Sequence, residues 1–509
     1  MRHCILLTAL SVLVLSSCEQ ASKAQVSEPD KIAEPAATPA DPKQSVIRIN
    51  STRQKWNPGQ PWEKQPPRKR RSLAAVVGDG QFITTSEMVA DATMIELESI
   101  DGKKLAQGKV IAVDYEANLA LIGLDDPEAD ASFSEGLVPL EIAEPFGLGD
   151  SVEAIQVEEN GTLLVTRGPV QSIDIVANFL PGEYFLTYEV KASMQSAASS
   201  FSVPALHDGK LAGLLTSYNS KDQISDITGT EILSRFLEDA ADGDYQGFPS
   251  LGVSTARTED AGFRSWLKLS DDVGGLYIAK VRKGSAAEAA ELKKGDVITV
   301  VDGHDIDRMG YFEHPIYGRT YWSHLVRGAK GAGESVTLGI LRDGETLELN
   351  VELERRDRQN ELVPGYLFGK APNFLVKGGF IFQELTRPLL ESFGDEWESR
   401  APLNLLDVLE NPDKYEDRYE RVVFLAGVIA TPATVGYEPL RNLIVTEVNG
   451  KPVRDMKSLI AAFDDVPGDG LHSIEFDEEN FKVYLDEVVS TQVDGELLQR
   501  GLSKLSRSE

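Results

Sequence analysis

Short runs of β-branched and other apolar residues, separated by turn-forming residues, dominate the chain from residue 45 to residue 242. The clearest runs are 45–49, 74–77, 94–97, 110–113 and 119–122. Runs of this length and spacing are typical of a β-barrel or a β-sandwich. One helix is predicted near the end of this segment, where Thr228 and Glu231 form a capping-box pattern ahead of apolar residues at helical spacing. We therefore expect a mainly β domain over residues 45–242 that ends in a helix.

Residues 1–18 have the pattern of an export signal. A short basic end precedes an apolar run from Ile5 to Leu15, which is too short to span a bilayer as a mature helix. The run ends in Leu-Ser-Ser-Cys and resembles the bacterial lipobox, whose cysteine is acylated after cleavage. We therefore predict a lipoprotein signal peptide with lipidation at Cys18. An ordinary secretory peptide cut near Cys18 is the alternative.

Residues 19–44 are rich in Ala, Pro, Glu, Lys and Ser and contain almost no aromatic residues. Such a composition cannot bury enough apolar surface to fold, so we predict a disordered tether. The expected location is the bacterial cell envelope, on the periplasmic side, with the membrane reached through the lipid anchor. Cys4 and Cys18 are the only cysteines, so no disulfide is expected in the mature protein.

The formal net charge of −30 argues against nucleic-acid binding, which requires a basic face. Residues 68–71, which read Arg-Lys-Arg-Arg, are a local exception. We predict that they form a solvated loop between the first two strands. Contact with anionic lipid or with an acidic patch of a sister subunit is the alternative.

A family resemblance is carried by the order of the strands, the segment Asn-Leu-Ala-Leu-Ile at 118–122, the stretch 204–213 and the closing helix. These features resemble the trypsin-like double β-barrel of the HtrA/Deg serine proteases, with the plant-type Deg branch nearest. The resemblance covers nearly everything after the tether. It implies a mainly β fold, with a trypsin-like double β-barrel followed by two PDZ domains of α+β type.

The resemblance places the catalytic triad at positions where this chain carries other residues. Glu87 stands at the position of the base histidine, and Asn118 at that of the orienting aspartate. The family's Gly-x-Ser-Gly-Gly-Pro loop here reads Ser-Ser-Phe-Ser-Val-Pro, which puts Phe201 in the nucleophile position, or Ser200 after a shift of one residue. A serine attacks only when a neighbouring base accepts its proton and a third group holds that base. We therefore expect no intact triad and a pseudoprotease.

Two other chemistries are disfavoured. Lys191 would act as a base for Ser193 or Ser200 only if it were desolvated, and nothing in its surroundings indicates burial. The acidic residues at and after Glu87 have no His or Cys companions at ligand spacing, so we predict no metal and no cofactor. His207, the only histidine of this domain, lies beyond the nucleophile loop.

Residues 248–356 have the pattern of a PDZ domain. Ser250, Leu251, Gly252 and Val253 fit the x-Φ-G-Φ loop whose backbone amides bind the C-terminal carboxylate of a peptide. The peptide then adds as a strand to the edge of the sheet. We predict peptide binding here. A groove closed by the protein's own chain is the alternative.

A weaker copy of the same module is predicted over residues 357–490. Segment 445–453 repeats segment 298–306 in length and pattern. In the family such a domain mainly serves assembly and docking, and no clear carboxylate loop is present, so an interaction role is expected. Residues 491–509 are polar and are predicted to form a loose tail.

Together these features predict a non-catalytic, HtrA/Deg-like envelope lipoprotein that binds unfolded proteins or peptide C-termini and acts as a scaffold or chaperone-like factor. A serine endopeptidase with an atypical site is one alternative, and a structural subunit of a mixed HtrA oligomer with an active paralogue is another. The family commonly forms trimers. Trp56 and Trp62 are candidates for packing across such an interface or for covering their own barrel.

Overall fold

The computed structural model describes residues 42–177, 179–194, 202–478 and 481–508. The predicted signal peptide with Cys18 and tether residues 19–41 lie outside the described residues, and so do Ser200 and Phe201. Pro42–Gln44 forms a short 3-10 turn before the first strand. None of the helices in the described part combines the length and apolar character needed to cross a bilayer.

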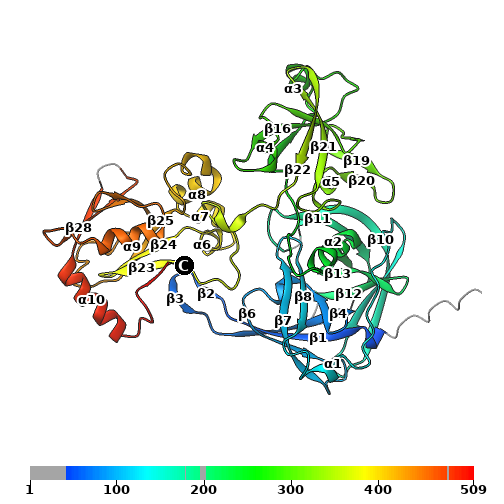
Figure 1. Cartoon of the computed structure of the whole chain (residues 1–509), viewed down its shortest axis with the longest axis horizontal. Coiled ribbons are helices and arrows are strands. Elements are labelled where there is room, and N and C mark those ends of the chain that lie inside the picture. Colours follow the sequence, from blue (N-terminus) through cyan, green and yellow to red (C-terminus); the bar gives the residue numbers. More distant parts are fainter. Residues whose placement is uncertain (1–41, 178, 195–201, 479–480, 509) are drawn as a thin grey trace, which may run out of the picture. The chain divides into compact units, whose positions relative to one another are not determined.

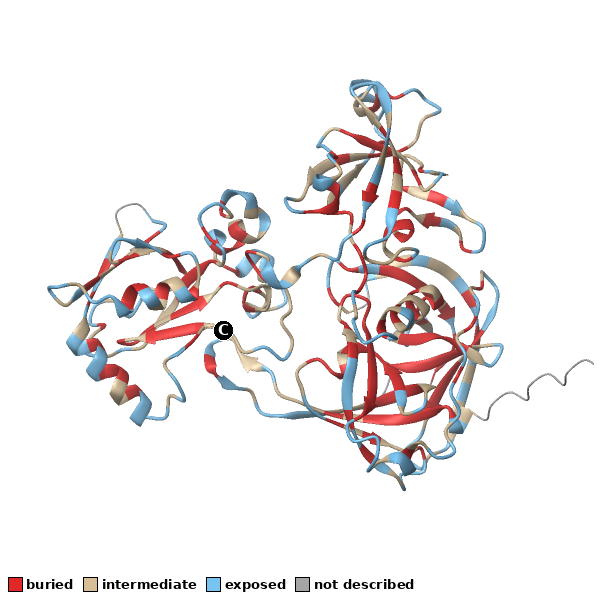
Figure 2. Cartoon of the chain, viewed as in Figure 1, coloured by how far each residue is buried: buried red, intermediate tan, exposed pale blue. Residues whose placement is uncertain are grey.

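The first domain contains two closed antiparallel barrels (Figure 1). In the order of pairing, the first consists of β1 (Val46–Arg53), β4 (Arg68–Gly78), β5 (Gln81–Thr84), β8 (Leu119–Leu124), β7 (Leu105–Asp114) and β6 (Ala92–Glu98). The second consists of β10 (Leu163–Ala177), β11 (Tyr184–Lys191), β14 (Ile224–Thr228), β13 (Lys210–Asn219), β12 (Val203–His207) and β9 (Ser151–Val157). Buried residues run along the strands of both barrels (Figure 2). The predicted double barrel is confirmed, and the five runs read from the sequence all lie in the first barrel.

Helix α2 (Thr230–Ala240) follows β14 and packs on the barrels through Ile232, Leu233 and Phe236. The predicted helix is therefore present, but the predicted capping box is wrong. The N-cap is Gly229, and no side chain caps the helix. Thr228 is the last residue of β14, and the Glu231 carboxylate contacts His324 instead of the helix end.

The basic residues 68–71 form the start of strand β4, so the predicted solvated loop is wrong. Arg70 and Arg71 are half-buried because acidic side chains of neighbouring elements neutralise them. Arg70 pairs with Glu87 at 2.7 Å, and Arg71 pairs with Glu98 at 2.9 Å.

The second domain is built on a sheet with the strand order β15 (Val253–Arg257), β16 (Leu276–Val281), β17 (Val297–Val301), β21 (Ser335–Arg342) and β22 (Glu345–Glu352). β18 (His304–Asp305) pairs with β17. A separate hairpin consists of β19 (Tyr311–His314) and β20 (Gly318–Tyr321). The helices are α3 (Ala261–Trp266), α4 (Ala286–Ala289) and α5 (Ser323–Arg327).

The third domain has the strand order β29 (Lys482–Asp486), β28 (Leu471–Phe476), β26 (Leu443–Val448), β25 (Val423–Val428), β24 (Phe380–Glu384), β23 (Phe374–Lys377) and β30 (Ser506–Arg507). β27 (Lys451–Pro452) pairs with β26. Its helices are α6 (Arg387–Glu391), α7 (Trp397–Arg400), α8 (Leu403–Glu410), α9 (Met456–Asp464) and α10 (Glu487–Gln499).

The predicted internal repeat is visible in the two sheets. β17 and β18 are joined by Asp302 and Gly303, and β26 and β27 by Asn449 and Gly450. All four turn residues have positive φ, between 45° and 79°. Positive φ at both central positions is the requirement of a type I′ hairpin turn, which Asp-Gly and Asn-Gly satisfy at low steric cost.

The predicted loose tail is wrong, because residues 491–499 belong to α10 and residues 506–507 pair with β23. Val493 and Leu497 of α10 pack against Phe374, and Trp62 joins the same cluster. Trp62 lies on the hairpin of β2 (Trp56–Asn57) and β3 (Gln60–Lys64). The N-terminal tryptophans therefore cover the third domain and not their own barrel.

Candidate functional site at the junction of the two barrels

Glu87, the residue predicted at the position of a catalytic base, lies in a 3-10 turn (Ser86–Met88) directly after β5. Its carboxylate Oε1 is 2.7 Å from Nη1 of Arg70, and both side chains are about one quarter exposed. β4 and β5 are hydrogen-bonded neighbours, and β4 also contacts the turn that carries Glu87. The carboxylate is thus engaged by a cation of its own barrel.

Asn118, the residue predicted at the orienting position, is buried and has a φ of 58°. Asparagine is one of the few residues with a β-carbon that adopt this left-handed conformation readily. Its Oδ1 accepts hydrogen bonds from the backbone N–H of Glu87 and from Oγ of Ser86, both at 3.1 Å. Asn118 therefore holds the backbone of the turn in place.

Ser202, the first described residue after the nucleophile-loop residues 195–201, was not singled out from the sequence. It is fully buried and has a φ of 57°, at a position where the family pattern has glycine. Its hydroxyl lies 2.5 Å from Oγ1 of Thr84, accepts from the N–H of Thr85 at 3.0 Å and contacts the carbonyl of Leu73 at 3.1 Å. The side chain therefore ties the second barrel to the first.

In the described part of this junction, hydroxyl groups form hydrogen bonds with amide groups, with carbonyl oxygens and with one another. The hydroxyls of Thr84, Ser86 and Ser202 make hydrogen bonds, none of them to an imidazole or an amine. Activation of a serine requires such a base within hydrogen-bond reach. Lys191, which was weighed as an alternative base, and His207, the only histidine of this domain, lie elsewhere.

His207 and Lys191 are both engaged away from the junction. Nδ1 of His207 lies 2.9 Å from the carbonyl of Ser151, and its ring stacks on Phe146 at a centroid distance of 4.3 Å. Lys191 is exposed, as predicted, and its Nζ donates to the carbonyl of Asp222 at 2.7 Å. Neither group has a hydrogen bond to a hydroxyl in the described part of the first domain.

The predicted carboxylate loop, Ser250 to Val253, leads into β15, an edge strand of its sheet. The carbonyls of Leu251 and Gly252 accept hydrogen bonds from the N–H groups of Ala287 and Arg282, inside the domain. In a trans peptide the C=O and N–H groups point in opposite directions, so the amides of the next two residues face away from these partners. Gly252 has a φ of 82°, and a Cβ there would lie 2.3 Å from Cβ of Ser285. The loop thus requires glycine at this position.

Two arginines and two glutamates join the first domain to the second. Arg327 of α5 pairs with Glu116 and Glu183 of the first domain, and Arg358, beyond the second domain, pairs with the same two carboxylates. Burial opposes ionisation of Glu116, but Arg327 and Arg358 hold its pKa below the usual value. The network therefore stabilises the docking of the second domain as long as these carboxylates stay charged.

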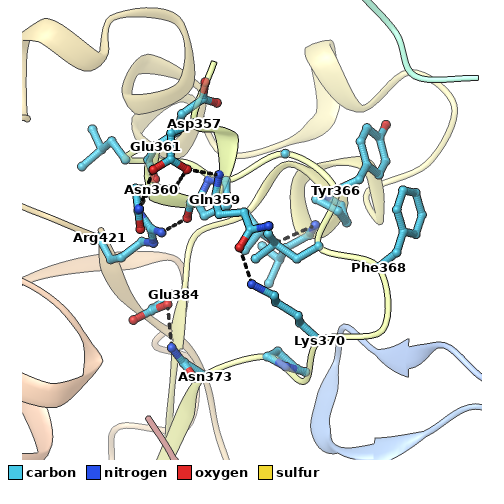
Figure 3. Close-up of a pocket in the computed structure, with 18 of the residues that line it drawn as sticks. Asp357, Gln359, Asn360, Glu361, Tyr366, Phe368, Lys370, Asn373, Glu384 and Arg421 are labelled. Atoms are coloured by element: carbon cyan, nitrogen blue, oxygen red, sulfur yellow. Dashed lines mark hydrogen bonds between the residues drawn. The ribbon is translucent and has the colours of Figure 1, made fainter. Parts of the chain in front are cut away.

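A pocket lies along the segment that connects the second and third domains (Figure 3). Several of its charged and polar groups are paired with one another. Arg421 donates to the carbonyls of Gln359 and Glu361, and Asn373 donates to Glu384 at 3.1 Å. None of the described residues that line the pocket stands at a predicted triad position.

Comparison with known proteins agrees with this architecture. Residues 249–353 and residues 363–509 each match a PDZ domain family model. The chain is 28% identical over 452 residues to Protease Do-like 2, chloroplastic, of Arabidopsis thaliana, covering 88% of this chain and 72% of that protein. It is 24% identical over 300 residues to the periplasmic serine endoprotease DegP of Escherichia coli, covering 57% of each. The solved structure of the HtrA-type protease AlgW with a decapeptide aligns with a TM-score of 0.46 and 18% identity, covering 62% of this chain and 96% of that chain.

Proposed function

Because the chain is an HtrA/Deg-family protein with two PDZ domains, we propose that it is a non-catalytic member that holds peptides without cutting them. Its ligands are unfolded segments or free peptide C-termini, bound at the first PDZ domain, and its role is that of a scaffold or chaperone-like factor. The observation that carries the proposal is the ion pair between Glu87 and Arg70 at the position of the base histidine.

The loss of catalysis is supported by the chemistry of the junction. In well-studied serine proteases, replacing the orienting aspartate by asparagine lowers turnover about 10⁴-fold, and removing the serine or the histidine lowers it about 10⁶-fold. Here Asn118 is bonded to the turn backbone, and Glu87 is bonded to an arginine. A carboxylate is also a much weaker base than an imidazole.

Peptide binding is supported by the geometry of the first PDZ domain. β15 is an edge strand that follows the glycine-containing loop, and the amides of Gly252 and Val253 face away from the domain's own hydrogen-bond partners. An edge strand preceded by outward amides is the arrangement that β-augmentation by a peptide C-terminus requires.

The proposed location is the periplasmic side of the bacterial cell envelope, with a lipid on Cys18 and residues 19–44 as tether. Support comes from the lipobox-like sequence and from the composition of the tether. Within the envelope the protein either forms a homo-oligomer or joins an active relative.

An active serine endopeptidase is the second candidate. It is favoured by the names of the relatives, which are proteases, and by the presence of Ser200 in the nucleophile loop. The two candidates differ in whether a bound peptide is released intact.

The test is a binding experiment that also monitors cleavage. Fluorescent peptides with a free or an amidated C-terminus are titrated with the tag-free mature protein, and each peptide is recovered afterwards for mass spectrometry. We expect binding of the free carboxylate form only, recovery of intact peptide, and loss of binding in Gly252→Ala.

Gly303→Ala is the matched control, because Gly303 also has a positive φ, of 79°, but has no atom within 4 Å of the added Cβ. Equal binding of both peptide forms, or equal loss in both variants, argues against the carboxylate loop. Recovered fragments argue for the endopeptidase.

A further inference from the structure

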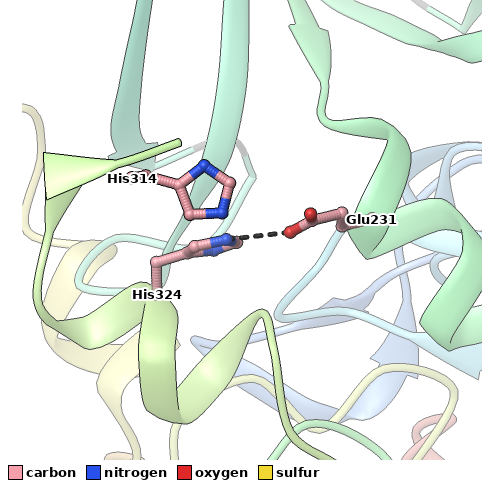
Figure 4. Close-up of side chains that lie close together, drawn as sticks. All are labelled: Glu231, His314 and His324. Carbon is pink, nitrogen blue, oxygen red and sulfur yellow. Dashed lines mark ion pairs between the residues drawn. The ribbon is translucent and has the colours of Figure 1, made fainter. Parts of the chain in front are cut away.

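A carboxylate and two imidazoles meet where the first PDZ domain contacts the second barrel (Figure 4). Glu231 lies in α2, whereas His314 ends β19 and His324 lies in α5. One ligand atom from each residue lies within 4.8 Å of the others, and Nε2 of His324 is 2.9 Å from Oε2 of Glu231. Contacts of β20 with β10 and of α5 with β11 hold the two domains together at this place. The cluster is separate from the barrel junction described above.

His324 is buried without a hydrogen-bond partner. Its side chain is 2% exposed, and neither ring nitrogen has an aligned hydrogen bond in the described part of the chain. The 2.9 Å contact with Glu231 therefore lacks hydrogen-bond geometry. Gly328 allows the ring to lie there, because a Cβ at residue 328 would come within 2.2 Å of Nδ1 of His324. Burying a polar group without an aligned partner is costly, so this imidazole needs a ligand.

A second buried histidine, also paired with a glutamate, has the hydrogen bonds that His324 lacks. Nε2 of His472 is 2.9 Å from Oε2 of Glu487, and its Nδ1 is 2.9 Å from Nδ2 of Asn449. Both nitrogens of His472 thus have hydrogen bonds. His472 is a satisfied core residue, whereas His324 faces a carboxylate and a second imidazole with its own nitrogens unsatisfied.

We propose that Glu231, His314 and His324 bind one divalent transition-metal ion of the zinc type, which ties the first PDZ domain to the second barrel. Two imidazoles and a carboxylate are a ligand set for such an ion, with water in the fourth position of a tetrahedron. Nδ1 of His314 accepts from the N–H groups of Ile316 and Tyr317 at 3.3 and 3.2 Å. When the ion binds Nε2, the ring proton is on Nδ1, which then no longer accepts these two hydrogen bonds. Their loss costs little, because both distances lie at the long end of the hydrogen-bond range.

The test uses Zn²⁺ alone and the tag-free mature protein after treatment with a chelator. Equilibrium dialysis followed by elemental analysis gives the stoichiometry and the dissociation constant, and thermal unfolding is followed with and without Zn²⁺. We expect one ion per chain, a higher Tm with Zn²⁺ that the chelator reverses, and at least about tenfold weaker binding in Glu231→Gln. Glu487→Gln is the matched control and leaves binding unchanged.

A second variant, His314→Asn, covers the case in which Glu231→Gln does not fold, because His314 is only half-buried. It is expected to weaken Zn²⁺ binding to a similar degree. Absence of binding by the wild-type protein, or binding that survives unchanged in both variants, overturns the proposal. Neither result depends on whether the protein cleaves peptides.

Discussion

Replacing Ser202 tests whether its hydroxyl is a structural tie between the barrels. Ser202→Ala leaves the buried N–H of Thr85 without its partner at 3.0 Å, whereas the carbonyl of Leu73 keeps Thr84 as a donor. An orphaned buried donor costs about 1–3 kcal/mol. For a domain of this size about 1 kcal/mol corresponds to about 2–4 °C in Tm, so a loss of roughly 2–12 °C is expected for the first domain. Differential scanning calorimetry of the mature protein measures it.

The variant Ser202→Gly separates the effect of losing the hydroxyl from the effect of backbone strain at residue 202. Residue 202 has a φ of 57°, a conformation that costs a residue with a β-carbon about 1–2 kcal/mol but costs glycine little. Part of this gain in stability, about 0.5–1 kcal/mol, is offset because glycine loses more conformational entropy on folding than alanine does. Ser202→Gly should therefore be less destabilised than Ser202→Ala. Ser193→Ala, at an exposed position, is the control and should unfold like the wild type. A wild-type Tm for Ser202→Ala, or a lower Tm for the glycine variant than for the alanine variant, refutes this reasoning.

Two further predictions concern the contacts between domains. Arg507 is 7% exposed and lies 4.4 Å from the ring of Trp56 and 5.4 Å from that of Phe374. Arg507→Ala should destabilise the third domain by about 2–4 kcal/mol in urea unfolding, whereas exposed Arg500→Ala should change it by less than about 0.5 kcal/mol. Acidification should weaken the docking of the first PDZ domain, because the folded-state pKa of Glu116 lies below the unfolded value. Its contribution is complete above about pH 5 and is lost as the pH falls below about 4. The Tm difference between wild type and Glu116→Gln should therefore shrink at acidic pH, and a difference that is constant with pH contradicts the role of the ion pairs.

Local patterns in the sequence predicted the strands of the first barrel and the repeated module, because alternation, turn residues and strand length are set by neighbours along the chain. The Asp-Gly and Asn-Gly turns at residues 302–303 and 449–450 are examples. The pairing of Glu87 with Arg70 joins a turn to a strand, and that of Glu231 with His324 joins two domains. No local signal reveals such partners. The C-terminal helix was missed because it buries only a narrow apolar face, so its overall composition is polar.

The central claim is that the first domain retains the double barrel of a protease without its proton-transfer chemistry. A fluorophosphonate probe, which labels activated serines, tests it most directly when the tag-free mature protein is compared with the active Escherichia coli relative in the same assay, with casein as substrate. We predict labelling and cleavage by the relative and neither by this protein. Labelling that disappears in Ser200→Ala, together with casein cleavage, would contradict the claim.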